Sequence, residues 1–393
     1  MLRALKKENE ITYVALDDGT HTSAAVAQAK EYADEVITVP HTPSAKFTFG
    51  FYVDLVKNSF SVLPYFMQKY RSREMREAIL AQLRARKFDV VVCDFLMPAI
   101  NFPDCLGTPS VLFQHNVEAQ IWQRHYEVQR NPVIKAFLWR QWRKTFNYER
   151  LTCQKFDLVV AVSPEDAALM HKNYGAENLA VVPTGVDTEY FSSGKDGMAR
   201  GFNIVFTGSM DWLPNDDAIR WFATSILPKI RREVPDVSLT VVGRDPSASL
   251  VDSFRHDASI RFTGRVEDVR GFMDQASVYV VPIRIGGGTR LKIYEAMSMG
   301  LPIVSTTVGA EGLSFSNGID IVIQDDADSF AGAVIELLSD NALARKMGAA
   351  AERRARTELD WQNVARVFSN ACQNLTLASS IRSNPSVGVH EAV

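Results

Sequence analysis

The stretch that decides the fold is VPIRIGGGTRLKIYEAMSMGLPIVSTTVGAEGL, residues 281–313. An apolar strand ends in three consecutive glycines, an amphipathic helix follows, and Gly300-Leu301-Pro302 breaks it before a second strand. Such a strand-to-helix turn presents backbone N–H groups at a helix N-terminus, and Arg290 and Lys292 add two cations there. The stretch therefore predicts a site for a phosphate-bearing ligand at the carboxyl ends of parallel strands.

The same alternation of apolar strands and amphipathic helices runs through the rest of the chain. The apolar runs are continuous rather than alternating, which is typical of parallel sheets covered on both faces. Around 186–201 the composition turns to Gly, Ser and charge, and the pattern then restarts. We therefore predict an α/β protein of two doubly wound, Rossmann-like domains that face each other across a ligand cleft. The strands are expected at 11–16, 35–40, 89–95, 110–116, 158–163, 179–185, 203–209, 238–244, 260–265, 278–283, 302–306 and 318–324.

Bulk composition narrows the class of protein. A chain of 393 residues is too long for a single hydrophobic core, so we expect two domains. The formal charge of −3 argues against a protein that binds nucleic acid through general electrostatic attraction. The 4 cysteines lack metal-ligand or disulfide spacing, so a reducing cytoplasm fits best. No apolar stretch is long enough to span a bilayer, and the first residues lack a signal-peptide pattern. We expect a cytoplasmic protein. Peripheral binding to the inner face of the plasma membrane is an open alternative.

Several ordered motifs resemble the retaining glycosyltransferases of family four, the group 1 glycosyltransferases with the GT-B fold. In the second half these are NIVFTGSMDWLPNDDAIRWF, SLTVVGR, RFTGRVEDV and the opening stretch, with VVPTGVD upstream. In the first half, DFLMP, FQHNVE and FDLVVAVSPED are similar to sugar transferases of bacterial exopolysaccharide clusters. The resemblance implies an acceptor-side domain at 1–190 and a donor-binding domain at 202–358. A helix at 359–375 follows, and the Ser-, Pro- and Gly-containing residues 376–393 are expected to form a mobile tail.

The resemblance also implies an activity. The protein would transfer a hexose from a nucleotide diphosphate sugar to a saccharide or lipid-linked saccharide, with retention of anomeric configuration, in exopolysaccharide or cell-surface glycan synthesis. No cofactor beyond the donor substrate and no metal are expected, because protein cations and helix N-termini do a metal's work. Two alternatives stay open: a catalytically degenerate nucleotide-sugar-binding protein or partner subunit, and an epimerase acting on the nucleotide sugar.

The donor contacts that the resemblance implies lie mostly in the opening stretch. Glu295 would accept hydrogen bonds from the ribose hydroxyls, unless it is only a helix-surface carboxylate. Arg290 and Lys292 would stabilise the departing diphosphate, unless they are solvated cations of a turn. The backbone of the glycine-rich turn would approach the diphosphate closely. Its residues are Gly286, Gly287, Gly288 and Thr289.

In three places the donor half differs from the family pattern or leaves two interpretations open. The family has a second acidic residue where this chain has Gly287. Gly208-Ser209, at the end of the first strand of the second half, is expected to face the cleft and contact the donor; many relatives carry an Arg and a Lys just beyond this turn, whereas this chain reads MDWLPN at 210–215. Phosphate binding therefore shifts to the cations of the opening stretch. Arg265 and Val266 would line the nucleobase pocket, although a plain strand-end turn fits them as well.

In the first half, the resemblance implies that His115 touches and aligns the donor sugar, although a structural role is an equal alternative. Asp94 could orient the acceptor or cap a helix. The segment 132–150 mixes tryptophans with cations and could dock on anionic lipid or hold a lipid-linked acceptor. We favour an amphipathic helix that packs its aromatic residues in the core. Relatives begin with a strand and a glycine-rich loop before the helix that matches MLRALKKENE, so we expect the first domain to lack that strand.

Overall fold

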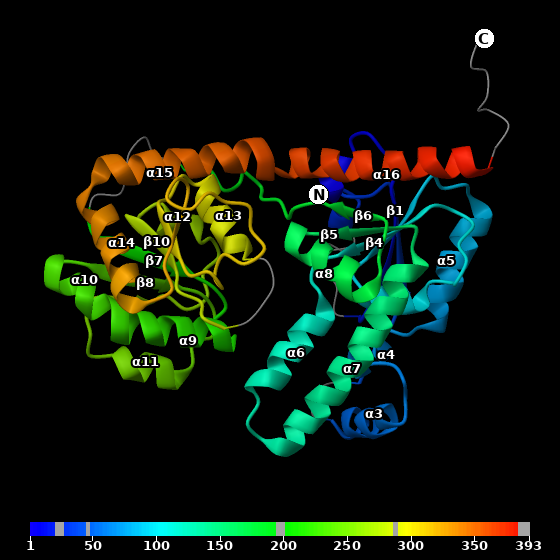
Figure 1. The fold of residues 1–393 in the computed structure, drawn as a ribbon, viewed down its shortest axis with the longest axis horizontal. Coiled ribbons are helices and arrows are strands. Elements are labelled where there is room, and N and C mark those ends of the chain that lie inside the picture. Colours follow the sequence, from blue (N-terminus) through cyan, green and yellow to red (C-terminus); the bar gives the residue numbers. More distant parts are fainter. Residues whose placement is uncertain (20–26, 45–47, 194–200, 286–289, 384–393) are drawn as a thin grey trace, which may run out of the picture. The chain divides into compact units, whose positions relative to one another are not determined.

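The computed structural model describes residues 1–19, 27–44, 48–193, 201–285 and 290–383. Contacts divide the chain into two compact units (Figure 1). The first unit is Met1–Val182 with Ala365–Val393, and the second is Pro183–Val364. Every named strand in both units pairs in parallel, and helices connect the strands. The prediction of an α/β protein with two Rossmann-like parts is therefore confirmed.

The unit borders fall at 182/183 and 364/365, whereas the sequence predicted borders at 190, 202 and 358. The last helix, α16 (Trp361–Ser383), lies almost wholly in the first unit. Residues 376–383 are helical rather than part of a mobile tail, so that prediction was wrong for them. Leu375 is buried near the predicted end, and the helix continues beyond it. The rest of the predicted tail, 384–393, lies outside the described residues.

The described residues of the first unit form two parallel sheets. One has the order β3-β4-β5-β6 and the other pairs β1 with β2. The strands are β1 (Thr12–Asp17), β2 (Glu35–Pro40), β3 (Val91–Asp94), β4 (Ser110–Gln114), β5 (Leu158–Ala161) and β6 (Leu179–Val181). The helices are α1 (Leu2–Leu5), α3 (Phe49–Ser59), α4 (Tyr65–Gln68), α5 (Arg73–Ala85), the 3₁₀ turn Met97–Asn101, α6 (Glu118–Val128), α7 (Pro132–Lys155) and α8 (Pro164–Tyr174).

Local sequence fixes where these helices begin and end. The hydroxyl of Ser163 accepts a hydrogen bond from the N–H of Asp166, and Pro164 occupies the first turn of α8. The helix ends at Gly175, whose φ of 65° is a left-handed conformation that glycine adopts without strain. Glu149 caps α6 from a distance, because its carboxylate accepts the N–H groups of Glu118 and Ala119. These caps hold α6, α7 and α8 around the four-stranded sheet.

The second unit is built on a six-stranded parallel sheet of order β12-β11-β10-β7-β8-β9. Its strands are β7 (Asn203–Thr207), β8 (Ser238–Val242), β9 (Ile260–Phe262), β10 (Val278–Val281), β11 (Ile303–Ser305) and β12 (Val322–Ile323). Its helices are α9 (Leu213–Trp221), α10 (Leu227–Glu233), α11 (Ala248–Phe254), α12 (Arg270–Met273), α13 (Leu291–Ser298), α14 (Ala327–Ser339) and α15 (Asn341–Arg354), with π-helical turns at Phe222–Ile226 and Ala355–Leu359. The last strand is shorter than predicted, because Gly318 takes a φ of 78° and its N–H closes a turn onto Ile321.

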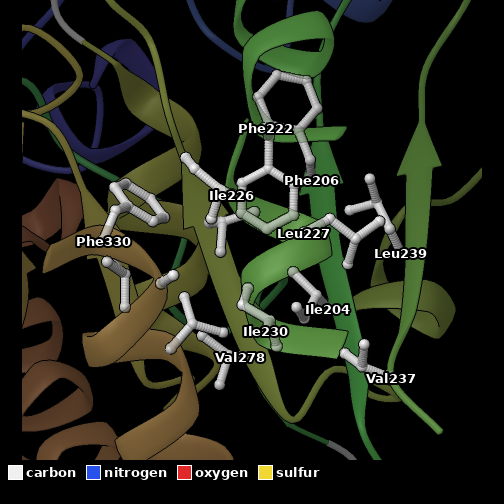
Figure 2. Close-up of a cluster of buried hydrophobic side chains, with 14 of the residues drawn as sticks. Ile204, Phe206, Phe222, Ile226, Leu227, Ile230, Val237, Leu239, Val278 and Phe330 are labelled. Carbon is white, nitrogen blue, oxygen red and sulfur yellow. The ribbon is translucent and has the colours of Figure 1, made fainter. Parts of the chain in front are cut away.

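The core of the second unit lies on both faces of this sheet. Ile204 and Phe206 of β7 point to one face, where they pack with Phe222 and Phe330 (Figure 2). The intervening Val205 points to the other face and packs in a second cluster with Ile293 of α13. Successive side chains of a strand alternate between faces, so a strand that is apolar throughout requires cover on both sides. The continuous apolar pattern predicted this arrangement.

Candidate functional site

Three neighbouring strands of the second unit end at one edge of the sheet. β7 is followed by Gly208-Ser209, β8 by Gly243-Arg244, and β10, after residues that are only partly described, by α13. The two glycines let the turns approach each other closely. A Cβ added at Gly243 would lie 1.8 Å from the carbonyl oxygen of Gly208, and one added at Gly208 would lie 2.6 Å from Nζ of Lys292. Only glycine fits at Gly243 without a backbone shift.

Lys292 lies beside the point where the turns at Gly208 and Gly243 meet. Its Nζ donates a hydrogen bond to Oδ1 of Asn215 at 3.1 Å and lies 4.2 Å from the ring centroid of Phe206. The pKa of Lys292 is lowered from 10.5 to about 7, chiefly by burial and then by the nearby Arg290, while Glu295 opposes the shift. An anion that enters beside this ammonium would favour the charged form. Lys292 therefore lies beside the Gly208-Ser209 turn, and its role toward a diphosphate stays a prediction.

Arg290 immediately precedes α13 and is 6% exposed. Its guanidinium lies 4.7 Å from the ring centroid of Trp212, so the indole supports the cation from one face. Trp212 precedes α9 at the end of the β7 turn. The two cations predicted from the opening stretch thus both contact the turn at 210–215, which the sequence marked only as lacking its own cations.

Asn215 fixes the position of that turn. It is 3% exposed, and its Nδ2 donates to the carbonyl oxygen of Ser209 at 2.8 Å while its Oδ1 accepts from Lys292. A buried amide with a partner on each side is a rigid link between the β7 turn and α13. Sequence reasoning missed both Asn215 and Trp212. The sequence signal that could have indicated them is the position of Asn215 in the first turn of a helix, three residues after Trp212.

Arg244 is a third cation at the same edge that the sequence analysis did not single out. Its Nε donates to Oγ of Ser209 at 3.1 Å, and its Nη2 lies 3.6 Å from Oδ2 of Asp211. It follows Gly243 directly at the end of β8, on the opposite side of β7 from β10. The sheet order therefore brings a cation from each neighbouring strand connection to the Gly208-Ser209 turn.

Glu295 lies one turn along α13 from Lys292, and each group affects the other's charge. Burial raises the pKa of Glu295 and Lys292 lowers it. The carboxylate is thus partly buried at the same end of the sheet as the two cations. Arg265 and Val266 follow the edge strand β9 and are farther from the β7 turn, because β8 lies between. Arg265 is exposed, whereas Val266 packs partly against the cluster beside α13.

The predicted backbone contacts of the glycine-rich turn fall on Gly286, Gly287, Gly288 and Thr289, which lie outside the described residues. Their roles remain predictions. Within the described part of the chain, no group of three or more His, Cys, Asp and Glu side chains is placed to hold a metal ion.

In the first unit, His115 and Asp94 form a pair. Nε2 of His115 lies 2.7 Å from Oδ1 of Asp94, and the two residues lie at the ends of the neighbouring strands β4 and β3. The imidazole also stacks on Phe95 at 3.9 Å between centroids. Phe95 has a φ of 72°, an uncommon conformation for an aromatic residue and one that is often found at functional sites. The structure thus brings together two residues that the sequence suggested separately.

The segment 132–150 forms most of α7 and divides its aromatic residues between two environments. Trp142 stacks on Tyr126 of α6 with centroids 5.7 Å apart, but neither ring belongs to the buried core cluster of the first unit. Trp139, in contrast, is about half exposed. Lys144 is buried and donates to the carbonyl oxygen of Asn58. Among the described residues, no helix is both long and apolar enough to cross a bilayer.

Comparison with known proteins assigns each half of the chain. Residues 2–190 match the family model described as Glycosyltransferase Family 4, and residues 201–340 match the model described as Glycosyl transferases group 1. Together with the two Rossmann-like units described above, these matches support a glycosyltransferase with the GT-B fold.

Individual relatives are distant. An uncharacterized 44.6 kDa protein in the cps region of Klebsiella pneumoniae is 22% identical over 72% of this chain and 73% of that protein. The phosphatidyl-myo-inositol mannosyltransferase of Mycolicibacterium smegmatis is 31% identical over 47% of this chain and 49% of that enzyme, so this chain spans about half of its length.

Solved structures show the same fold. A sucrose-phosphate synthase from Thermosynechococcus elongatus has a TM-score of 0.64 and 16% identity, covering 94% of this chain and 100% of that one. Anabaena HepE, in complex with UDP, has a TM-score of 0.59 and 14% identity, covering 95% of this chain and 100% of that one. At these identities the likeness extends to the fold alone.

Proposed function

We propose that the protein transfers a hexose from a nucleotide diphosphate sugar to a saccharide or lipid-linked saccharide, with retention of configuration. The observation that carries this proposal is the convergence of Arg290, Lys292 and Arg244 on the glycine turn after β7. Cations and backbone N–H groups at the carboxyl ends of parallel strands suit a diphosphate. Crystal structures of the HepE relative with UDP and with UDP-glucose support a donor of this class.

Each group has a role that its surroundings suit. Glu295 accepts hydrogen bonds from the ribose hydroxyls, and Arg265 and Val266 border the base. Arg290 and Lys292 stabilise the charge that develops on the diphosphate as the glycosidic bond breaks and its electron pair leaves with the phosphate oxygen. The donor also raises the pKa of Lys292, so the ammonium is fully charged when needed.

The retaining step needs no protein nucleophile in this proposal. The acceptor hydroxyl forms the new bond on the face from which the diphosphate leaves, and its proton passes to the departing phosphate oxygen. That His115 contacts the donor sugar remains a prediction; Asp94 would fix the orientation of its ring. No cofactor or metal is proposed beyond the donor substrate.

The acceptor is proposed as a saccharide, free or carried on a lipid, in exopolysaccharide or cell-surface glycan synthesis. Two relatives support this class. One comes from a cps region, and the other is by name a mannosyltransferase acting on phosphatidyl-myo-inositol. A cytoplasmic location and membrane contact through 132–150 stay predictions. The alternative of a degenerate nucleotide-sugar-binding protein is favoured by Gly287, which replaces an acidic residue of the family pattern.

Calorimetry with nucleotide analogues tests the ribose contact directly. UDP, GDP and ADP are first compared, and the best binder is then compared with its 2′,3′-dideoxy form. Loss of hydrogen bonds to a carboxylate weakens wild-type binding of the dideoxy form about tenfold or more. Glu295→Ala should weaken the parent nucleotide similarly and abolish the difference between the two. Glu336→Ala, an exposed change on α14, is the control.

If Glu295→Ala still distinguishes the two nucleotides, the site assignment fails. Measuring turnover of nucleotide sugars distinguishes an active glycosyltransferase from a catalytically degenerate nucleotide-sugar-binding protein. Release of free sugar or transfer to a saccharide acceptor supports the enzyme, whereas tight nucleotide binding without release from any donor supports the alternative.

A further inference from the structure

Helix α3 of the first unit exposes a stripe of large apolar side chains. Phe49, Tyr52, Val56 and Phe60 recur at intervals of three and four residues, which places them along one face of the helix and its end. Val62 follows in the next turn. Phe49 is 86% exposed, and Phe60 and Val62 are 88% exposed. We call these five residues the α3 stripe. A face this apolar normally packs inward, and here it does not.

The opposite side of α3 is firmly attached, so the stripe is not a loosely packed core face. Asn58 is 1% exposed, and its Nδ2 donates to the carbonyl oxygen of Leu63 and to Gln68. Gln141 and Lys144 of α7 donate to Asn58 in turn. A second tie runs from Arg140 of α7 to the carbonyl oxygen of Ser59. The polar network holds one face of α3 on α7 and leaves the apolar face outside.

The first half of α7 adds further exposed apolar residues. Val133 is exposed, and Ile134 and Trp139 are each about half exposed. Figure 1 shows α3 and the first turns of α7 at the same end of the first unit, away from its four-stranded sheet. The exposed tryptophan is notable because indole side chains favour the boundary between water and lipid.

Charge around the stripe has the opposite sign to the charge of the chain. The whole chain carries −3, yet residues 48–72 hold three cations and one carboxylate, and residues 132–148 hold four cations and no carboxylate. The single carboxylate, Asp54, is hydrogen-bonded to Ser44. Residues 118–131, which include α6, add two arginines and two glutamates, so they leave the balance unchanged. The cations that surround the stripe are Lys57, Lys69, Arg71, Lys135, Arg140 and Arg143; Lys144 is buried against Asn58 and is not one of them.

We propose that the α3 stripe inserts into the interface of an anionic lipid bilayer while the surrounding cations bind its headgroups. A helix that is apolar on its free face and flanked by Lys and Arg fits the plane of such an interface. A second copy of the chain would bring like charges together, which opposes that occupant. The proposal goes beyond sugar transfer and requires no nucleotide. It also centres the contact on α3 rather than on 132–150.

Vesicle flotation of the full chain tests the proposal without nucleotide. Vesicles of phosphatidylcholine alone are compared with vesicles that also contain phosphatidylglycerol. The double variant Phe49→Ser with Phe60→Ser should lower the partition coefficient on anionic vesicles at least about tenfold, because it removes two aromatic side chains from the buried area. Ile319→Ser removes a residue of the second unit that is 60% exposed and should bind as wild type.

A charge variant examines the headgroup contacts. Lys57→Gln with Arg143→Gln should weaken binding to anionic vesicles severalfold and reduce its dependence on salt. Folding of each variant is checked by its melting temperature and nucleotide binding in solution, which should not change because the altered side chains are exposed. Nucleotide binding therefore reports on the transferase proposal separately.

Three results would overturn the bilayer proposal. The serine variant could bind anionic vesicles as tightly as wild type. Wild type could bind neutral vesicles equally well, or bind neither kind. Finally, sedimentation velocity could show that the serine substitutions dissociate a dimer, which would assign the α3 stripe to a contact between copies.

Discussion

Lys292 and Asn215 join the first turns of α13 and α9 through one hydrogen bond, from Nζ to Oδ1 at 3.1 Å. Asn215 is otherwise held by its bond to the carbonyl oxygen of Ser209. The partner of the Lys292 ammonium is therefore a neutral amide. Many relatives are expected to carry further cations in this part of the chain. The bond positions the nitrogen of Lys292 without adding a negative charge beside it.

Replacing Asn215 with Ala should weaken binding of a nucleoside diphosphate about tenfold at neutral pH, the cost of a hydrogen bond to a charged group. The loss of an acceptor disfavours the ammonium, so the pKa of Lys292 should fall and binding should recover partly as the pH is lowered. Calorimetry across pH measures both effects. Asn341→Ala, at the start of α15, is the control; a pH-independent loss would show that Asn215 acts only on the fold.

The free energy of unfolding should rise with pH between about 7 and 10.5. Burial lowers the pKa of Lys292 to about 7 from 10.5, so over this range the unfolded chain binds the proton and the folded chain does not. The cost of burying the charged Lys292 lowers the free energy of unfolding by its full amount below about pH 7, and this cost disappears as the pH rises towards 10.5. Lys292→Met should flatten this part of the curve, which urea unfolding at several pH values can measure. An unchanged slope in the variant would contradict the assignment.

Glu149 should produce the opposite slope at lower pH. Burial raises the pKa of Glu149 to about 7, opposed by hydrogen bonds from Ala119, Tyr174 and Glu118. The folded chain then retains a proton that the unfolded chain has lost, so stability should fall as pH rises from about 4.5 to 7.

Glu149→Gln should remove that slope. It should also destabilise the first unit by about 1–3 kcal/mol, because the amide nitrogen of the new side chain cannot accept the bonds that the carboxylate oxygen accepts. Urea unfolding followed at several pH values is the measurement. If the variant keeps the slope of the wild type, a group other than Glu149 titrates in this range.

Glycine substitutions should separate fold from site. Gly243→Ala should destabilise the second unit by several kcal/mol, because its Cβ would overlap the carbonyl oxygen of Gly208. Gly208→Ala meets side-chain rather than backbone atoms, Nζ of Lys292 and the amide of Asn215, and would disturb the hydrogen bond between them; we expect a smaller loss of stability and a larger loss of nucleotide affinity. Gly332→Ala on α14 meets nothing and should stabilise by up to about 1 kcal/mol. Thermal unfolding and calorimetry on the three variants give the comparison.

The fold was predictable because continuous apolar strands admit few arrangements. Phe206 and Val205 face opposite clusters, as a doubly wound sheet requires. The two cations of the candidate site were also predictable, since they lie at one helix N-terminus in sequence. Asn215 and Arg244 were not, because they join the site through neighbouring strands and turns far apart in the chain. The pairing of His115 with Asp94 likewise depends on the register of β3 and β4.

One wrong prediction and one unpredicted feature have a common cause. The composition of 376–383 suggested a tail, yet these residues continue α16. The exposed face of α3 was not predicted, since an inward-facing and an outward-facing apolar stripe have the same spacing. In both cases tertiary contacts decide which residues are helical and which face is exposed, and these contacts cannot be predicted from the local pattern of a single sequence.

The first unit is assembled from both ends of the chain. Phe368 of α16 packs edge-on against Phe113 of β4, with ring centroids 5.5 Å apart, although the entire second unit separates the two residues along the chain. On the ribosome, the whole of the second unit is therefore synthesised before the first can acquire its last helix. The unit that begins first is completed last, so a nascent chain passes through a stage in which only its middle portion has all of its packing partners.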